Sequence, residues 1–531
     1  MKTLRSGLKN VFFSFLLMGL MGCNSLAEKN PKIDLEEITI ADLQQGYKTG
    51  KFTIVGITQA YLDRIEAIDK NGPALNAVIR VNPDALEIAA SLDEELRQGK
   101  SRGAMHGIPV LLKDNIDTHD KMPNTAGSVI MKNSFPLQDA WVTRKLREAG
   151  AVIIGKTNLS EWANFHSSYS SSGWSALGGQ TKNPYDLTRN PCGSSSGSGV
   201  AVSANLTVIA IGTETDGSIV CPANNNGIVG IKPTVGLVSR SGIIPISFTQ
   251  DTPGPMARTV RDAAICLGIM TGVDPKDSKT SGSEGKSLAD YSPFLNTDGL
   301  KGKRVGYDKT LAGRNHHVDN VMMEAVEFIK NSGAEVIEIQ NIIAPEIENM
   351  EFEVMLYEFK DGLNKYFTTL GENAAVRSVE ELIKLQSADS TEMEWFDHKL
   401  IELAQEKGPV DSDEYRRIIV RDMLKGARDN GIDKIMDTHR LDAIIAPTGS
   451  PAWKTDWVNG DNFGISSSSA AAIAGYPAIS LPMGFVSGLP VNITFYGKAW
   501  SEPTLIEMAF AFEQGTKHRR KPVLNTENSR P

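Results

Sequence analysis

The sequence predicts an α/β fold in which helices pack on a largely buried β-sheet. Along most of the chain, short apolar runs of strand length alternate with segments of helical periodicity. Of the 531 residues, 40% are apolar and 22% are charged, which excludes a disordered chain. Only one apolar run, at the N-terminus, approaches membrane-spanning length, so a polytopic membrane protein is excluded as well.

The first half of the chain shows this alternation most clearly. Ile57, Tyr61, Ile65 and Ile68 recur at helical spacing, and the Asn-Gly-Pro sequence at 71–73 ends that helix. The apolar runs that follow are too short for helices and therefore predict strands. We expect strands at 77–81, 107–113, 151–155 and 206–212, and helices at 84–98, 141–149 and 197–204.

The second half continues the pattern with a longer helical insertion. A polar segment at 274–290 predicts a surface loop, and residues 345–440 are mostly helical and charged. The length alone suggests three or four domains, but no repeat or long linker separates the pieces, which favours one interleaved domain. We expect strands at 304–307, 334–339 and 441–447, and a helix at 318–331.

Charge and cysteine content narrow the function further. The net charge of −9 argues against nucleic acid as the main partner. No C-x-x-C pair, H-E-x-x-H motif or phosphate-binding loop is present, so we expect neither a metal nor a cofactor. His316 and His317 are adjacent in a polar segment, where they are expected to face solvent.

The N-terminus has the layout of a secretory signal. Three basic residues (Lys2, Arg5 and Lys9) precede an apolar run at 11–21 that is short for a transmembrane helix. The run ends in Leu-Met-Gly-Cys at 20–23, which resembles a bacterial lipobox with a looser fit at the methionine. We expect a signal peptide at 1–22 that is removed on export.

In this interpretation Cys23 becomes the lipidated first residue of the mature chain. Its acyl chains would hold the protein on a membrane of the cell envelope. Asn24 stands where an inner-membrane retention signal would place Asp, which favours the outer membrane. The alternative is an uncleaved membrane anchor.

Three segments carry the chemistry: HGIPVLLKDNID at 106–117, NPCGSSSGSG at 190–199 and GTETDGSIVCPANNNGIVGIKPT at 212–234. Each segment alone is a weak signal, but the set is specific. It consists of a lysine that ends an apolar strand, a Gly-Ser-Ser run and a later Gly-Ser turn. Together they resemble the amidase signature family of serine hydrolases. Further matches are TAGS at 125–128, NLSEWA at 158–163, DTPGPMART at 251–259 and AGYPAISLPMGF at 474–485.

This resemblance implies a large central mixed β-sheet covered by helices on both faces, in a single domain. It spans most of the chain, so the length is better explained by one catalytic domain than by several. The division we expect is a signal peptide at 1–22, a tether at 23–35, a catalytic domain at 36–520 and a tail at 521–531.

The resemblance also implies the roles of three residues: Ser218 as nucleophile, Ser194 as a bridging serine and Lys113 as the base. A serine hydroxyl needs a base at neutral pH, and lysine serves only where burial lowers its pKa. Lys113 ends an apolar strand, which fits that need. In the family the bridging serine follows a cis peptide bond, here Gly193–Ser194. The small-residue run at 197–204 would pack as a close helix behind it.

The turn before Ser218 is expected to form the oxyanion hole. Backbone N–H groups of Thr215, Asp216, Gly217 and Ser218 would stabilise the tetrahedral oxyanion. Ser218 would attack the amide, an amine or ammonia would leave, and water would cleave the acyl-enzyme.

Several residues depart from the family pattern. Cys192 and Ser196 stand at positions that are often Gly, and TETDGS replaces the common TDTGGS, so that Asp216 adds a carboxylate to the oxyanion turn. Val220 and Cys221 occupy positions where some members hold a substrate carboxylate with Arg, which favours a neutral substrate end.

The same stretch looks especially like bacterial peptide amidases, which remove the C-terminal amide of peptides. A peptide amide is therefore the expected substrate. Fatty and aryl amides are the alternatives within the family.

Cys192 and Cys221 flank the two active-site serines in sequence. A disulfide between them is conceivable in an oxidising compartment. Two buried free thiols are the favoured interpretation.

The sequence also holds weaker matches to other functions. Residues 193–197 also match the G-x-S-x-G elbow of α/β hydrolases, with Ser195 as nucleophile, but no strand directly precedes them. The S-x-x-K match from Ser283 to Lys286 lies in a polar loop. A non-catalytic substrate-binding lipoprotein would lack the lysine–serine–serine set. A tRNA-dependent amidotransferase component needs cytoplasmic partners, against which the export signal argues.

Overall fold

The structure is a computed structural model that describes residues 33–524 except residue 373. The predicted signal peptide and the lipidation residue Cys23 therefore lie outside the described residues. From Leu35 onward the described residues form one compact unit. No helix among the described residues is both long enough and apolar enough to cross a membrane.

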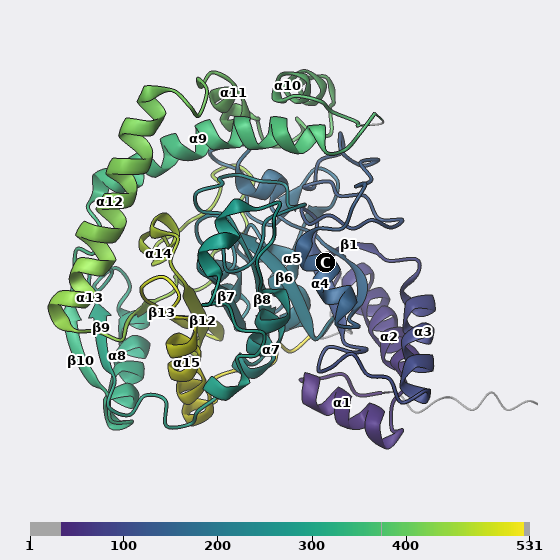
Figure 1. Cartoon of the computed structure of the whole chain (residues 1–531), viewed down its shortest axis with the longest axis horizontal. Helices are drawn as coiled ribbons and strands as arrows, with labels where there is room; N and C mark the ends of the chain where they lie inside the picture. Colours follow the sequence, from purple (N-terminus) through teal and green to yellow (C-terminus); the bar gives the residue numbers. More distant parts are fainter. Residues whose placement is uncertain (1–32, 373, 525–531) are drawn as a thin grey trace, which may run out of the picture. The chain divides into compact units, whose positions relative to one another are not determined.

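An eleven-stranded mixed sheet forms the centre of this unit (Figure 1) and confirms the predicted fold class. The strand order is β1-β3-β2-β6-β8-β7-β12-β13-β11-β9-β10. The strands are β1 (Val78–Val81), β2 (Pro109–Lys113), β3 (Val152–Thr157), β6 (Ile209–Glu214), β7 (Val229–Lys232), β8 (Thr252–Ala257), β9 (Arg304–Asp308), β10 (Glu335–Ile339), β11 (Ala443–Pro447), β12 (Ala478–Val486) and β13 (Leu489–Tyr496). A separate two-stranded hairpin joins β4 (Trp174–Ser175) to β5 (Gly179–Gln180).

Two parallel groups flank an antiparallel middle. β3, β2 and β6 are parallel to one another, as are β10, β9 and β11. Parallel neighbours need crossover helices, and α4 (Trp141–Glu148), α5 (Ser196–Ser203) and α8 (His316–Asn331) supply them. The carboxyl ends of β2, β3 and β6 therefore meet at one edge, where open α/β sheets bind their ligands.

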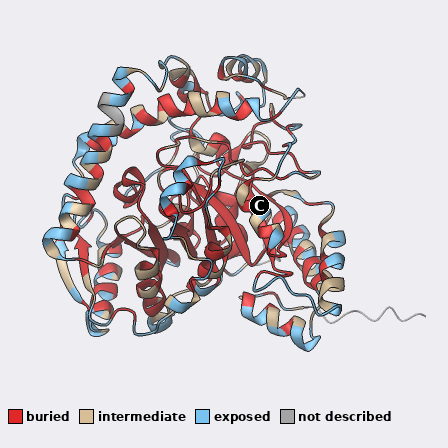
Figure 2. Ribbon diagram, in the orientation of Figure 1, coloured by how far each residue is buried: buried red, intermediate tan, exposed pale blue. Residues whose placement is uncertain are grey.

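The strands of the first parallel group are buried along their whole length, so both faces of the sheet are covered (Figure 2). Their sequences indicate the same burial on both faces, because polar residues do not alternate with apolar ones along these strands. The remaining helices of the body are α1 (Ile40–Thr49), α2 (Ile54–Arg64), α3 (Ala85–Arg97), α6 (Val220–Asn225), α7 (Val260–Met270), α14 (Ser469–Ala474) and α15 (Glu502–Thr516).

The long helical insertion is also confirmed. In Figure 1 its helices run as an arc from above the sheet centre to the β9–β10 border. It contains α9 (Pro345–Thr368), α10 (Val379–Ala388), α11 (Lys399–Gln405), α12 (Leu424–Ala427) and α13 (Asp433–His439), with π-helical turns at Tyr415–Met423 and Arg428–Ile432. α9 buries Val354, Phe359 and Leu363 against the body and leaves its opposite side exposed.

Two local predictions need correction. The helix predicted from the spacing of Ile57 to Ile68 is α-helical only as far as Arg64, the end of α2, and continues as a π-helix over Ile65–Lys70. The segment 274–290 is only partly a surface loop, because Asp274 accepts hydrogen bonds from the hydroxyls of Ser239 and Ser241, each at 2.6 Å. These contacts hold the loop against the body.

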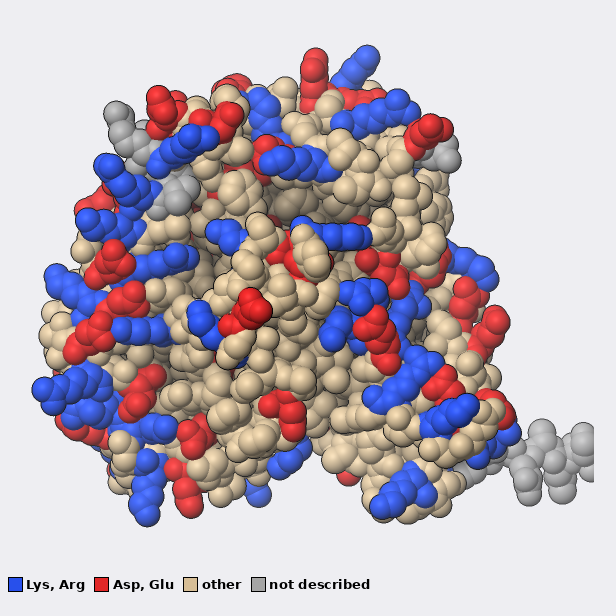
Figure 3. All heavy atoms as spheres, viewed as in Figure 1, with Lys and Arg blue, Asp and Glu red and all other residues tan. Residues whose placement is uncertain are grey.

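Charged side chains of both signs mix on one face of the molecule. On the face of the described residues drawn in Figure 3, basic and acidic side chains are interspersed. That face therefore offers no continuous basic surface of the kind that binds nucleic acid.

Candidate active site

Lys113, the last residue of β2, is fully buried at the carboxyl edge of the sheet. Its Nζ donates to Ser194 Oγ at 2.7 Å, to Thr213 Oγ1 at 2.9 Å and to the Thr213 carbonyl at 3.2 Å. Burial lowers the pKa of Lys113 to about 7, although Asp251 and Glu214 act in the opposite direction. A large fraction of this amine is therefore neutral at physiological pH.

Ser194 lies between Gly193 and the start of α5. The Gly193–Ser194 peptide bond is cis, as the family resemblance implied. A Cβ on Gly193 would lie 2.1 Å from Ser160 Oγ, so this position accepts only glycine. α5 packs closely too, because a Cβ on Gly197 would lie 2.2 Å from the Ala77 carbonyl oxygen. These contacts fix the place of Ser194.

Ser218 stands in the turn between β6 and α6. Ser195 N donates to the Ser218 carbonyl at 3.2 Å, so the two serine-bearing segments are joined through their backbones. Glu214 Oε2 accepts from Ile219 N at 2.7 Å and from Val220 N at 3.0 Å, which holds the turn from the other side. The turn also needs glycine, since Gly217 has a φ of 80°.

The Ser218 side chain is nearly buried. The Ser195 hydroxyl is fixed to the backbone of β6: it donates to the Thr213 carbonyl at 3.0 Å and accepts from Thr213 N at 3.2 Å. The nucleophile elbow of an α/β hydrolase needs a strand directly before its serine, and no strand directly precedes Ser195. Ser195 therefore serves to join α5 to β6.

The other weak motifs have structural roles. Ser283 donates to the Thr280 carbonyl at 2.7 Å, while Lys286 lies over the ring of Trp500. His316 and His317 are exposed, as predicted. No cluster of His, Cys, Asp and Glu among the described residues could hold a metal ion.

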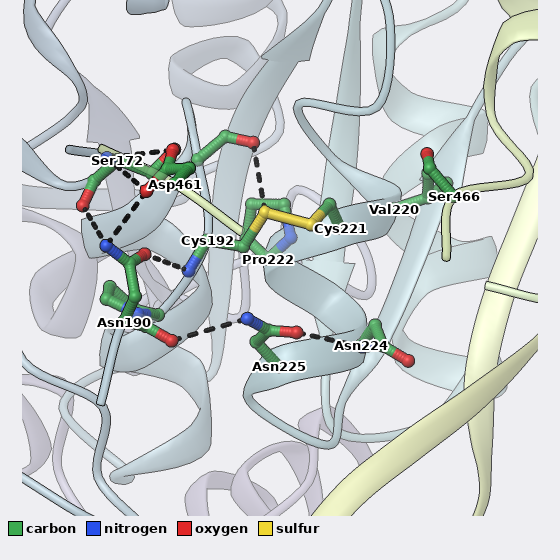
Figure 4. The surroundings of a disulfide bond; sticks show 12 residues. Ser172, Asn190, Cys192, Val220, Cys221, Pro222, Asn224, Asn225, Asp461 and Ser466 are labelled. Atoms are coloured by element: carbon green, nitrogen blue, oxygen red, sulfur yellow. Dashed lines mark hydrogen bonds between the residues drawn. A yellow bond between two sulfur atoms is a disulfide. The ribbon is translucent and has the colours of Figure 1, made fainter. Parts of the chain in front are cut away.

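Cys192 and Cys221 form a disulfide bond, so the prediction of two free thiols is wrong (Figure 4). Their Cα atoms lie 5.9 Å apart, and 29 positions separate them in sequence. The backbone contact between the segments of Ser194 and Ser218 brings the cysteines together, and nothing in the local sequence shows that contact. The bond links the residue before Gly193 to α6, directly after the Ser218 turn.

Next to the disulfide, Asp461 anchors a distant loop to the site (Figure 4). Its carboxylate accepts from Ser172 N at 3.0 Å, Asn190 Nδ2 at 3.3 Å and Trp453 Nε1 at 3.2 Å. Burial raises the pKa of Asp461 to about 6. Sequence reasoning missed this residue, because it belongs to no motif and acts only through tertiary contacts.

A second carboxylate, whose role the sequence did not show, supports the turn before Ser218. Asp251 accepts from Thr215 Oγ1 at 2.6 Å and from the backbone N–H groups of Ile246 and Ser247 at 2.8 and 2.9 Å. Burial raises its pKa to about 6 despite these hydrogen bonds. Asp251 thus ties the turn to the loop after residue 243.

A cavity of about 320 Å³ opens next to these groups. Ser194, Thr213 and Thr215 lie along it, although Ser218 is not among the described residues that line it. Apolar residues of the 243–248 segment and the Gly362–Tyr366 stretch of α9 form other parts of its wall. The cavity therefore reaches the Lys113–Ser194 pair from the side of α9.

Comparison with known proteins agrees with this geometry. The family model described as Amidase matches residues 56–506. The chain belongs to the amidase family. A probable amidase of Arabidopsis thaliana is 40% identical over 520 residues, which cover 96% of each chain. A glutamyl-tRNA(Gln) amidotransferase component of Carboxydothermus hydrogenoformans is 33% identical over 513 residues, which cover 93% of this chain and 100% of its own.

Solved structures give the same result. The native peptide amidase of Stenotrophomonas maltophilia superimposes with a TM-score of 0.88 at 48% identity, covering 92% of this chain and 99% of its own. A peptide amidase has also been solved in complex with the competitive inhibitor chymostatin, and that structure matches with a TM-score of 0.89. This amidase is accordingly a hydrolase that acts on amide bonds.

Proposed function

We propose that Ser218 is the nucleophile of a Ser-Ser-Lys triad in which Ser194 passes the proton of Ser218 to Lys113. The observation that carries this proposal is the 2.7 Å hydrogen bond between the buried Lys113 amine and Ser194 Oγ. An amine whose pKa lies near 7 accepts a proton and returns it at neutral pH. Ser218 attacks the carbonyl carbon, the C–N bond breaks, and the leaving nitrogen takes the proton back through Ser194.

The oxyanion that forms during attack needs donors that are already in place. Backbone N–H groups of the turn from Thr215 to Ser218 are the candidates. Support comes from the contacts that hold this turn, namely Glu214 on the α6 side and Asp251 on the Thr215 side. Water then hydrolyses the acyl-enzyme, with Lys113 as its base.

For the substrate we propose a C-terminal peptide amide, from which the enzyme releases ammonia. The 48% identity to a peptide amidase over nearly the whole chain supports this choice. Cys221 is held in a disulfide and Val220 is apolar, so neither residue supplies a cation for a substrate carboxylate. A neutral carboxamide end fits such a site better than a free acid.

Two measurements test the proposal. A fluorophosphonate probe should label Ser218, and Ser218→Ala should abolish both the labelling and amide hydrolysis. Labelling of Ser195 would contradict the triad. A panel of a peptide amide, a peptide bond, a fatty amide and an aryl amide should show the highest kcat/KM for the peptide amide; a preference for the fatty or aryl amide would overturn the substrate assignment.

We also propose that the protein is exported and lipid-anchored through Cys23 on the cell envelope. The sequence at 1–23 supports this location, and a structural disulfide is typical of oxidising compartments. Mass spectrometry of the mature N-terminus should find a diacylglycerol on Cys23, and Cys23→Ser should release the protein from membranes. An unmodified N-terminus that begins at Met1 would contradict the proposal.

A further inference from the structure

Asp216 places a carboxylate in the turn that carries the oxyanion donors, where many amidases have glycine. Its Oδ1 atom is buried and has no hydrogen-bond donor among the described residues as long as neighbouring carboxyls are ionised. A buried acceptor without a donor has lost its hydrogen bonds to water without replacement, which is unfavourable. A hydrogen-bond donor close to Asp216 would therefore stabilise the turn.

Glu351, in the second turn of α9, reaches this position from the helical insertion. Glu351 is 6% exposed, and its carboxyl lies within hydrogen-bonding reach of the Asp216 carboxyl. Its Oε1 accepts from Gln250 Nε2 at 2.5 Å, and the same nitrogen lies 3.5 Å from the Thr215 carbonyl oxygen. Glu351 thus contacts the turn directly at Asp216 and indirectly at Thr215.

A hydrogen bond between two carboxyl groups requires a proton on one of them. Burial and the negative charge of Asp216 raise the pKa of Glu351 well above its usual value, and Glu348 on the same helix adds to this. Asp216 also interacts electrostatically with two other buried groups, the carboxyl of Glu214 and the amine of Lys232. Glu351 therefore keeps its proton to a higher pH than an ordinary glutamate does.

A neighbouring carboxylate on the same helix shows the contrast. Glu358, two turns further along α9, accepts hydrogen bonds from Ser247 Oγ, Thr249 N, Thr249 Oγ1 and Tyr415 Oη. Its oxygens are satisfied by ordinary donors, so no proton is needed there. Glu351 has only Gln250 as a donor among the described residues, which leaves its second oxygen free to carry the proton toward Asp216.

We propose that Glu351 is a positioning residue: in its protonated form it donates a hydrogen bond to Asp216 and holds the oxyanion turn in place. This inference rests on the proposed function, because the turn matters for catalysis only if it binds the oxyanion. Loss of the proton at alkaline pH would leave two buried carboxylates facing each other. Their repulsion would move the turn, and turnover would fall.

The test compares three variants on α9 by their pH profiles of kcat and KM. Glu351→Gln keeps a donor for Asp216 and an acceptor for Gln250, so kcat at pH 7 should stay within about threefold of wild type and the alkaline decline should disappear. Glu351→Ala removes the donor and should lower kcat about tenfold to a hundredfold, with KM changed much less. Glu346→Gln, at an exposed position of the same helix that does not contribute to the pKa of Glu351, should keep the wild-type profile.

Two results would overturn the proposal: an unchanged alkaline decline in Glu351→Gln, or wild-type kcat in Glu351→Ala. If Glu351→Ala fails to fold, the Glu351→Gln profile alone decides. Labelling of Ser218 by the fluorophosphonate probe is measured in every variant. If Ser218 is not labelled even in the wild-type enzyme, the proposed function fails; if it is labelled and the profiles do not differ, only the role of Glu351 fails.

Discussion

The ends of β2 and β3 each carry a fully buried lysine, but their surroundings differ. Lys113 donates only to neutral oxygens, those of Ser194 and Thr213. Lys156, which pairs in register with the residue before Lys113, has a carboxylate: its Nζ lies 3.8 Å from Asp114 Oδ1. The difference teaches that burial alone does not make a lysine a base. Burial lowers the pKa of Lys156 as well, but the nearby carboxylates of Asp114 and Asp117 favour its charged form, so this lysine is better suited to stabilise the fold.

The surroundings of Lys156 support this interpretation. Its Nζ also donates to the Ile116 carbonyl and to Asn124 Oδ1. Asn124 in turn donates to Asp117, which accepts from Tyr366 of α9 at 2.8 Å. This network joins the β3 end to the helical insertion, so it stabilises the fold and contacts none of the proposed triad residues.

Lys113→Ala should have the largest effect, a fall in kcat of about 10³-fold or more, because no other group can accept the proton of Ser194. The thermal unfolding midpoint should change little. Lys113→Arg should be as inactive, since a guanidinium does not lose its proton. Steady-state kinetics and calorimetry check both variants. Turnover near the wild-type level in either would remove Lys113 from the mechanism.

Lys156→Met should act on stability instead. It leaves Asp114 buried without its cation, which costs about 3–5 kcal/mol of unfolding free energy. The midpoint of thermal unfolding should drop, while kcat of the folded fraction stays within about tenfold of wild type. Adding Asp114→Asn should restore part of the loss. Should Lys156→Met reduce kcat as strongly as Lys113→Ala without lowering the midpoint, the contrast between the two lysines would be lost.

The pH dependence of kcat/KM is the smallest of the expected effects. Lys113 acts as a base only when neutral, so its protonated fraction rises and kcat/KM falls as pH drops through about 7, the pKa of this amine. Below that value the decline should approach about tenfold per pH unit. The residual activity of Lys113→Ala should lack this decline, whereas Lys156→Met should keep it. A decline that persists in Lys113→Ala would assign it to another group, such as Asp251 or Asp461.

The sequence predicted much of this structure because its signals were local. Apolar runs of strand length placed β2, β3, β6 and β11 to within a few residues, and the motif set brought attention to Lys113, Ser194 and Ser218. The strand β8 was not predicted, because Pro253 and Pro255 are residues that normally argue against a central strand.

The supporting carboxyls could not be predicted in the same way. Asp461 and Glu351 lie outside every quoted motif, and Asp251 opens the match at 251–259 without any sign of its role. The chemistry of all three arises from burial and from partners on other elements. The Cys192–Cys221 bond escaped prediction for a related reason, since only the folded contact of two loops places the sulfurs together.

That bond also bears on how the protein must be produced. Crosslinking residues 29 positions apart removes about 3–4 kcal/mol of loop-closure entropy from the unfolded chain. A chain synthesised in a reducing cytosol would start without this constraint and would hold the segments of Ser194 and Ser218 together by weaker contacts, such as the Ser195 N–Ser218 O hydrogen bond. Recombinant enzyme made in the cytosol and in the periplasm should therefore differ in specific activity at equal purity, and reoxidation of the cytosolic preparation should close the gap.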